Sequence, residues 1–73
     1  MLETIKIRLT RENLDDLHEG DVFTEDRAWG AVKSVRLTRD GYENAMVYVI
    51  TPDGRESRDV LGLPSTVEIE RNV

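Results

Sequence analysis

Turn sequences divide this chain into short segments, and this division limits the elements that it can form. The clearest turn is residues 51–54 (TPDG), where proline fixes φ at the first corner and Asp-Gly supplies the rest. A second Asp-Gly pair, within residues 39–42, predicts a hairpin turn because these residues tolerate a positive φ. Only short strands or a short helix fit between such breaks. With 73 residues and no cysteine, we expect one domain over residues 1–73, with a small core and no disulfides.

Hydrophobic alternation predicts a mainly β structure. Residues 3–9 alternate apolar and polar side chains, which is typical of a strand with one buried face. Residues 45–50 are apolar at every position and predict a central strand that is at least partly covered on both faces. In the last strand, residues 66–70, Val67 and Ile69 are expected to point inward. Residues 21–23 begin another predicted strand. Two further strands are expected, one over residues 31–38 with a bulge near residues 33–34, and one over residues 55–60.

One short helix is expected after the first strand, between residues 11 and 19. Leu14 and Leu17 lie three positions apart and share one helical face, and Gly20 is a suitable residue for ending the helix. We expect these two leucines to cover the outward side chains of the central strand. Residues 62–65 predict a 3-10 turn immediately before the last strand.

Four parts of the chain carry a recognisable spacing: LHEGDVF at residues 17–23, WGAV at 29–32, PDGR at 52–55, and LPS at 63–65 followed by VEI at 67–69. Together they resemble the SH3-like small β-barrel superfamily. The resemblance covers residues 14–71 and implies a five-stranded antiparallel β-barrel with one short helix after the first strand. It implies no particular activity, because this fold hosts many unrelated functions. The spacing is also similar to that of small uncharacterised proteins of actinobacteria and their bacteriophages, and arginine outnumbers lysine as in GC-rich coding sequences.

The negative charge is concentrated in one stretch. Seven acidic residues lie between Glu12 and Asp26, where there is no Lys or Arg, so the net charge of −5 comes from this acidic band. Such a band attracts basic partners and repels phosphates. We therefore expect contact with a basic protein surface, against the alternative of a solvated face that keeps the protein soluble. The predicted partner-binding residues are Glu12, Asp15, Asp16, Glu19, Asp21 and Trp29.

Trp29 and the last strand suggest how such contact is made. Trp29 either plugs one end of the barrel or anchors an interface, since Trp is enriched in binding hot spots. Residues 66–70 contain no proline and are expected at an open edge, where pairing between copies would give a homo-oligomer. The first hypothesis is a non-catalytic small β-barrel that acts through protein–protein contact, with itself or with a host or larger partner.

The resemblance implies a second hypothesis, because SH3-like and Sm-like barrels commonly bind RNA. The residues that would contact RNA or DNA are Lys33, Arg36, Arg39 and Arg55, with a tyrosine to stack on a base. The net charge opposes this hypothesis, since neutralisation of phosphates dominates such affinities. The competing interpretation is that these cations pair with acids on neighbouring strands.

Motifs for catalysis are missing from the sequence. There is no nucleophile elbow and no glycine-rich phosphate loop, so we predict no enzyme and no cofactor. Asp15, His18 and Glu19 would share a helix face, but three ligands on two frayed turns make a poor cage, and we predict no metal site. The start, MLET, lacks the basic and apolar regions of a signal peptide, and no run is long enough to span a membrane. We therefore expect a cytoplasmic protein.

Overall fold

The computed structural model describes residues 1–24 and 30–73. Its strands form one sheet of antiparallel neighbours in the order β1-β6-β2-β3-β4-β5. A single turn of 3-10 helix, η1, follows the first strand. The bounds of the elements are β1 (Leu2–Leu9), η1 (Leu14–Asp16), β2 (Val22–Phe23), β3 (Ala31–Leu37), β4 (Asn44–Ile50), β5 (Glu56–Gly62) and β6 (Ser65–Asn72).

The mainly β fold is confirmed, whereas the expected number of five strands is wrong, and the sheet does not close into a barrel. The two-residue strand β2 pairs with both β6 and β3, and it brings the number of strands to six. A barrel closes only when its outermost strands pair with each other. Across the described residues, β1 pairs with β6 alone and β5 with β4 alone, so the sheet stays open. Charged and exposed side chains lie on both faces of β5, and this strand therefore gains little by covering β1.

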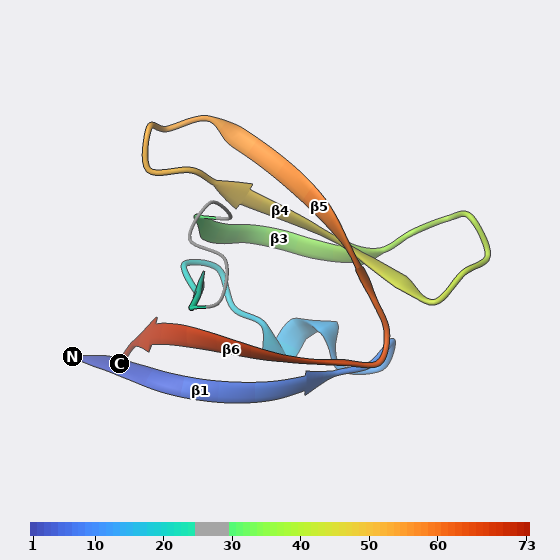
Figure 1. Cartoon of the computed structure of the whole chain (residues 1–73), viewed down its shortest axis with the longest axis horizontal. Helices are drawn as coiled ribbons and strands as arrows, with labels where there is room; N and C mark the ends of the chain where they lie inside the picture. Colours follow the sequence, from blue (N-terminus) through green and yellow to red (C-terminus); the bar gives the residue numbers. More distant parts are fainter. Residues whose placement is uncertain (25–29) are drawn as a thin grey trace.

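The sheet folds over on itself so that its two halves face each other (Figure 1). The strands β1 and β6 form one half, and β3, β4 and β5 form the other. The chain passes from β5 to β6 through a sharp bend, and the two termini lie side by side at the opposite end. This arrangement encloses one core between the halves.

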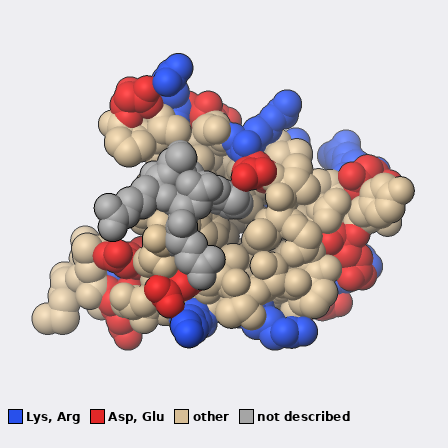
Figure 2. Space-filling view, in the orientation of Figure 1, with Lys and Arg blue, Asp and Glu red and all other residues tan. Residues whose placement is uncertain are grey.

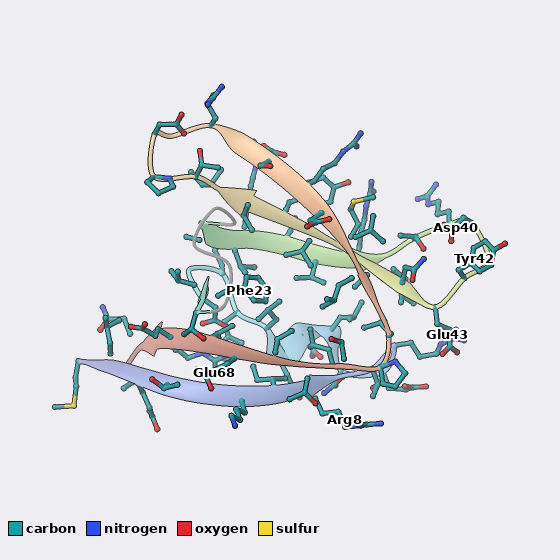
Figure 3. All side chains as sticks on the ribbon, viewed as in Figure 1. Arg8, Phe23, Asp40, Tyr42, Glu43 and Glu68 are labelled. Atoms are coloured by element: carbon teal, nitrogen blue, oxygen red, sulfur yellow. The ribbon has the colours of Figure 1, made fainter. Side chains whose placement is uncertain are left out.

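The core is built from the alternating positions that face this interior. Ile7 and Leu9 come from β1, and Val67 and Ile69 come from β6, as the alternation predicts. Phe23 of β2 lies between the two halves (Figure 3). The remaining buried members are Leu17, Val32, Ala45, Val47 and Val49. Full burial of such side chains, each stabilising by about 1.5–3 kcal/mol, is the main favourable term for a domain of this size.

The short helix expected between residues 11 and 19 is present only as a single 3-10 turn, because only the three residues of η1 are helical. The side chain of Asn13 accepts a hydrogen bond from the Thr10 N–H at 2.6 Å and donates to the Arg8 carbonyl at 2.9 Å. These bonds lie at the start of η1. The His18 N–H, which a longer helix would bond to the Leu14 carbonyl, donates to the Asp21 side chain instead, and the helix ends after one turn. The expected 3-10 turn at residues 62–65 is wrong. The chain bends there at a cis Leu63–Pro64 peptide, and the Leu63 N–H bonds to the Glu43 carbonyl.

Two backbone irregularities shape the half of the sheet that contains β3. The predicted bulge is confirmed, because the register between β3 and β4 shifts between Val32 and Ser34. Just before β3, Gly30 adopts a positive φ of 75° and passes very close to the backbone at Ile50. A Cβ atom at Gly30 would lie 2.2 Å from the Ile50 carbonyl oxygen, so only glycine fits at this crossing.

The expectation that the last strand forms an open edge is wrong. β6 lies between β1 and β2, and its register with β1 runs without interruption from Leu9↔Ser65 to Leu2↔Asn72. The edges of the sheet are β1 and β5 instead. A hydrophobic alternation predicts which face of a strand is buried, but it says nothing about which neighbours the strand will have.

Candidate functional site

The predicted acidic surface is only partly a surface. Glu12, Asp15, Asp16 and Glu19 are exposed around η1. Asp21 is buried, with 1% of its surface accessible. The other predicted residue of this set, Trp29, and the acids Glu25 and Asp26 lie outside the described residues. The acidic segment therefore offers four exposed carboxylates to a basic partner, and its fifth predicted carboxylate belongs to the interior.

Asp21 is held by a buried ion pair with Arg71, near the end of β6. Arg71 donates from Nε to Asp21 Oδ1 at 2.9 Å and from a terminal nitrogen to Oδ2 at 2.8 Å. The His18 backbone N–H donates to the same Oδ2 at 2.8 Å, and Arg71 also reaches the Asp16 carbonyl at 2.8 Å. The pair ties the turn after η1 to a strand 50 positions further along the chain.

This environment shifts both ionisable groups toward their charged forms. Burial alone raises the pKa of Asp21, but the hydrogen bonds from Arg71 and from the His18 N–H outweigh it, and the pKa is lowered overall. The hydrogen bond to Asp21 raises the pKa of Arg71 in turn. Asp21 and Arg71 thus stabilise the fold as a charged pair. Sequence reasoning placed Asp21 on the surface and did not single out Arg71. The sequence signal that indicates the burial of Asp21 is its position between a predicted turn and the apolar start of β2.

The cations proposed for nucleic-acid binding mostly have partners within the chain. The Lys33 ammonium lies 2.9 Å from a Glu56 carboxylate oxygen, and Arg55 Nε lies 2.8 Å from an Asp53 oxygen. Arg36 stacks over the Tyr48 ring at 5.3 Å from its centroid and donates to its hydroxyl oxygen at 2.7 Å. The remaining residue of the set, Arg39, is exposed between β3 and β4. Positive and negative side chains are interspersed over the face seen in Figure 2.

The outward face of β4 is not covered in the expected way. Leu17 lies in the core with Val47 and Val49, which is the opposite side of the strand from the one it was expected to cover. Met46 and Tyr48 are half-buried, and Ile50 is 37% exposed. Next to Met46 on β5, Val60 is 48% exposed. The outer face of the β4–β5 pair is therefore a mixed surface of apolar, aromatic and basic side chains.

The free edge of β5 is the most accessible feature of the sheet. Five consecutive residues, from Glu56 to Val60, are exposed, and within the described residues only β4 pairs with this strand. At the ends of the β4–β5 ladder, the Thr51 N–H bonds to the Arg55 carbonyl and the Leu63 N–H bonds to the Glu43 carbonyl, each at 2.8 Å. Hydrogen-bonded pairs alternate along an antiparallel ladder.

This alternation sets the direction of every backbone group on β5. The uninterrupted register between the two ends makes Ser57, Asp59 and Leu61 the residues bonded to β4. The N–H and C=O groups of Glu56, Arg58 and Val60 then point away from β4. The Val60 N–H donates to the Asp59 side chain at 2.7 Å, and the groups of Glu56 and Arg58 point to the free edge of the sheet. Sequence reasoning did not identify this edge, although alternating charges such as those of residues 55–59 (RESRD) are typical of an edge strand.

Metal and membrane sites do not emerge from the described part of the chain. In residues 1–24 and 30–73, no three His, Cys, Asp or Glu side chains gather closely enough to hold a metal ion. The expected shared face of Asp15, His18 and Glu19 does not exist, because η1 ends at Asp16. Over the same residues, no helix has the length and apolar character needed to cross a membrane.

Comparison with known proteins gives no family for this fold. No protein-family model, no curated protein and no solved structure matches this chain.

Proposed function

We propose that this chain is a non-catalytic domain that acts through protein–protein contact, with the free edge of β5 as its contact surface. The observation that carries the proposal is the outward direction of the backbone groups of Glu56 and Arg58 along an exposed strand. An extended segment of another protein can join a sheet at such an edge, and its backbone supplies the hydrogen bonds.

The charges around β5 support a protein rather than a nucleic acid as the partner. Two of the four proposed nucleic-acid-binding cations, Lys33 and Arg55, are paired with carboxylates, and the chain carries a net charge of −5. Binding to phosphates would therefore have to overcome an unfavourable overall charge. A polypeptide strand with mixed charges carries no such density of negative charge.

The β1 edge is the less suitable surface. The outward charges of β1, Lys6 and Arg8, are both positive, whereas β5 carries charges of both signs, and like charges directly opposite each other in a sheet are destabilising. A row of like charges also limits the partners to acidic strands. We assign the contact function to β5 for this reason.

A proline substitution at the edge tests the proposal. Arg58→Pro removes one outward N–H of β5. It removes no bond to β4, because the Arg58 N–H points away from β4, and edge strands tolerate proline at such positions. Thr4→Pro is the matched control at the β1 edge. The measurement is the protein bound by each immobilised variant from lysate of the natural source, together with the solution mass of each variant and its thermal unfolding.

The proposal expects wild type and Thr4→Pro to retain the same protein, either another copy or a foreign chain, and folded Arg58→Pro to lose it. Equal retention by folded Arg58→Pro would refute β5 as the contact surface. Retention of nucleic acid in place of protein, seen as a high absorbance at 260 nm, would favour the alternative function through Arg36 and Arg39.

A further inference from the structure

Residues 55–59 of the β5 edge form a charge pattern that is complementary to itself. Read in either direction, the sequence Arg-Glu-Ser-Arg-Asp places opposite charges at positions equally distant from Ser57. When two copies run antiparallel with Ser57 facing Ser57, Glu56 of each copy faces Arg58 of the other. In the same register, Arg55 faces Asp59. All four pairs are attractive.

The backbone of β5 is in phase with this register. Antiparallel pairing with Ser57 at the two-fold axis makes Glu56 and Arg58 the hydrogen-bonded partners across the new interface. These are the residues whose N–H and C=O groups point to the free edge. Glu56 and Arg58 also share the outer face of the sheet, whereas Ser57 and Asp59 share the inner face, so each charge pair meets on one side.

The neighbouring antiparallel registers place like charges opposite each other. An axis at Arg58 places two arginines opposite each other, and an axis at Asp59 places two aspartates opposite each other. Like charges directly opposite in a sheet are destabilising. Pairing of β1 with a second β1 has a similar defect, because its outward charges, Lys6 and Arg8, are both positive.

From these observations we propose that the partner at the β5 edge is a second copy of this chain, bound antiparallel with Ser57 on the two-fold axis. The inference rests on the proposed contact function of β5 and names its partner. The dimer joins two open sheets into one continuous sheet and leaves the β1 edges at its two ends.

The ion pairs that Glu56 and Arg55 make within one copy do not prevent this pairing. The Lys33–Glu56 and Arg55–Asp53 pairs are exposed, and surface pairs of this kind contribute little. Each carboxylate or guanidinium can exchange its partner or accept a second one. Because the new pairs are also close to solvent, salt is expected to weaken the dimer.

Single introduced cysteines report directly which residues face each other in the dimer, because the chain has no cysteine of its own. Ser57→Cys places two thiols in a non-hydrogen-bonded pair, where the Cα atoms lie about 4.5 Å apart and a disulfide can form. In the proposed register, Arg58→Cys and Asp59→Cys lie more than about 7 Å from their counterparts, beyond disulfide reach. Thr4→Cys on β1 measures random collision. Oxidation of each variant is followed as disulfide dimer on non-reducing gels.

We expect Ser57→Cys to cross-link at least about tenfold faster than the other three variants. Faster cross-linking at position 58 or 59 would overturn the register. Cross-linking at position 57 no faster than at position 4 would overturn the dimer.

Charge reversal provides an independent test that leaves the backbone unchanged. Arg58→Glu faces Glu56 across the interface twice per dimer and is expected to raise the dissociation constant about tenfold or more. Glu56→Arg has the same effect through two arginine pairs. The double variant Glu56→Arg/Arg58→Glu restores opposite charges in the swapped order and is expected to recover the dimer. A double variant as weak as either single variant, or single variants as strong as wild type, would refute the proposal.

The results separate this inference from the proposed function. A monomeric wild type that still retains a foreign protein, lost in Arg58→Pro, would refute the second copy as partner and leave β5 as a contact surface. If Arg58→Pro keeps both self-association and capture of a foreign protein, the dimer and the contact function of β5 are both refuted.

Discussion

Replacing Asp21 by asparagine tests whether the buried pair with Arg71 holds the turn after η1 against β6. The carboxylate accepts three hydrogen bonds, at 2.8 to 2.9 Å. An asparagine keeps one acceptor oxygen and turns its NH₂ group toward an N–H donor, so at least one donor loses its partner. The substitution also leaves the Arg71 guanidinium without its counter-charge.

The magnitude follows from the burial of the pair. Removing one partner of a buried ion pair costs about 3–5 kcal/mol, and we take the lower end because 20% of the Arg71 side chain reaches solvent. A domain of this length is stable by about 4–11 kcal/mol, so a loss of about 3 kcal/mol is a large share. The expected fall in melting temperature is about 12–24 °C.

The dependence of the folding stability on acid pH is the second part of this test. The pKa of Asp21 is lowered in the folded state, so the unfolded chain binds a proton more readily. The contribution of Asp21 is fully present above about pH 5 and is lost as the pH falls below about 4, through the folded pKa. Wild type should therefore lose stability over this range, and Asp21→Asn should lose less.

Urea unfolding followed by far-ultraviolet circular dichroism measures both effects. Glu43→Gln is the matched control, because it removes one carboxylate from an exposed pair with Arg11, outside residues 55–59 of β5, and should cost less than about 1 kcal/mol at neutral pH. A loss for Asp21→Asn as small as that of the control would refute the reasoning, as would an unchanged dependence on acid.

The remaining predictions concern packing and backbone. Leu9→Ala should destabilise the domain by about 2–5 kcal/mol in urea unfolding, because Leu9 is fully buried; a loss under about 1 kcal/mol would contradict the described core. Gly30→Ala should cost at least about 2 kcal/mol, since its Cβ would meet the Ile50 backbone, whereas Gly41→Ala, with positive φ but open space, should cost about 1–2 kcal/mol. Equal losses at the two glycines would show that the close approach to Ile50 has no energetic effect.

Short-range patterns predicted the faces of the strands well. The alternation in residues 3–9 and 66–70 correctly indicated the inward positions Ile7, Leu9, Val67 and Ile69. The apolar pair Val32 and Val35, three positions apart, correctly indicated a bulge. Each of these features depends on neighbours along the chain, which a sequence displays directly.

Long-range features were not predictable in the same way. The place of β6 between β1 and β2 depends on pairings across more than 40 positions, and alternation is equally compatible with an edge. Asp21 stands in a run of acids that is typical of a solvated face, and its burial depends on Arg71, 50 positions away. The shortening of the expected helix to η1 had a local cause, since the Asp21 side chain accepts from the His18 N–H that a longer helix would bond to the Leu14 carbonyl.

Sedimentation equilibrium of the untagged protein, over concentrations up to about 1 mM, tests most directly whether the β5 edge pairs two copies. The account predicts a mass that rises with concentration from 8.4 kDa toward twice that value, with Arg58→Glu remaining near 8.4 kDa and Glu56→Arg/Arg58→Glu recovering the rise. A wild-type mass of 8.4 kDa at every concentration, or a rise that Arg58→Glu leaves unchanged, would contradict it.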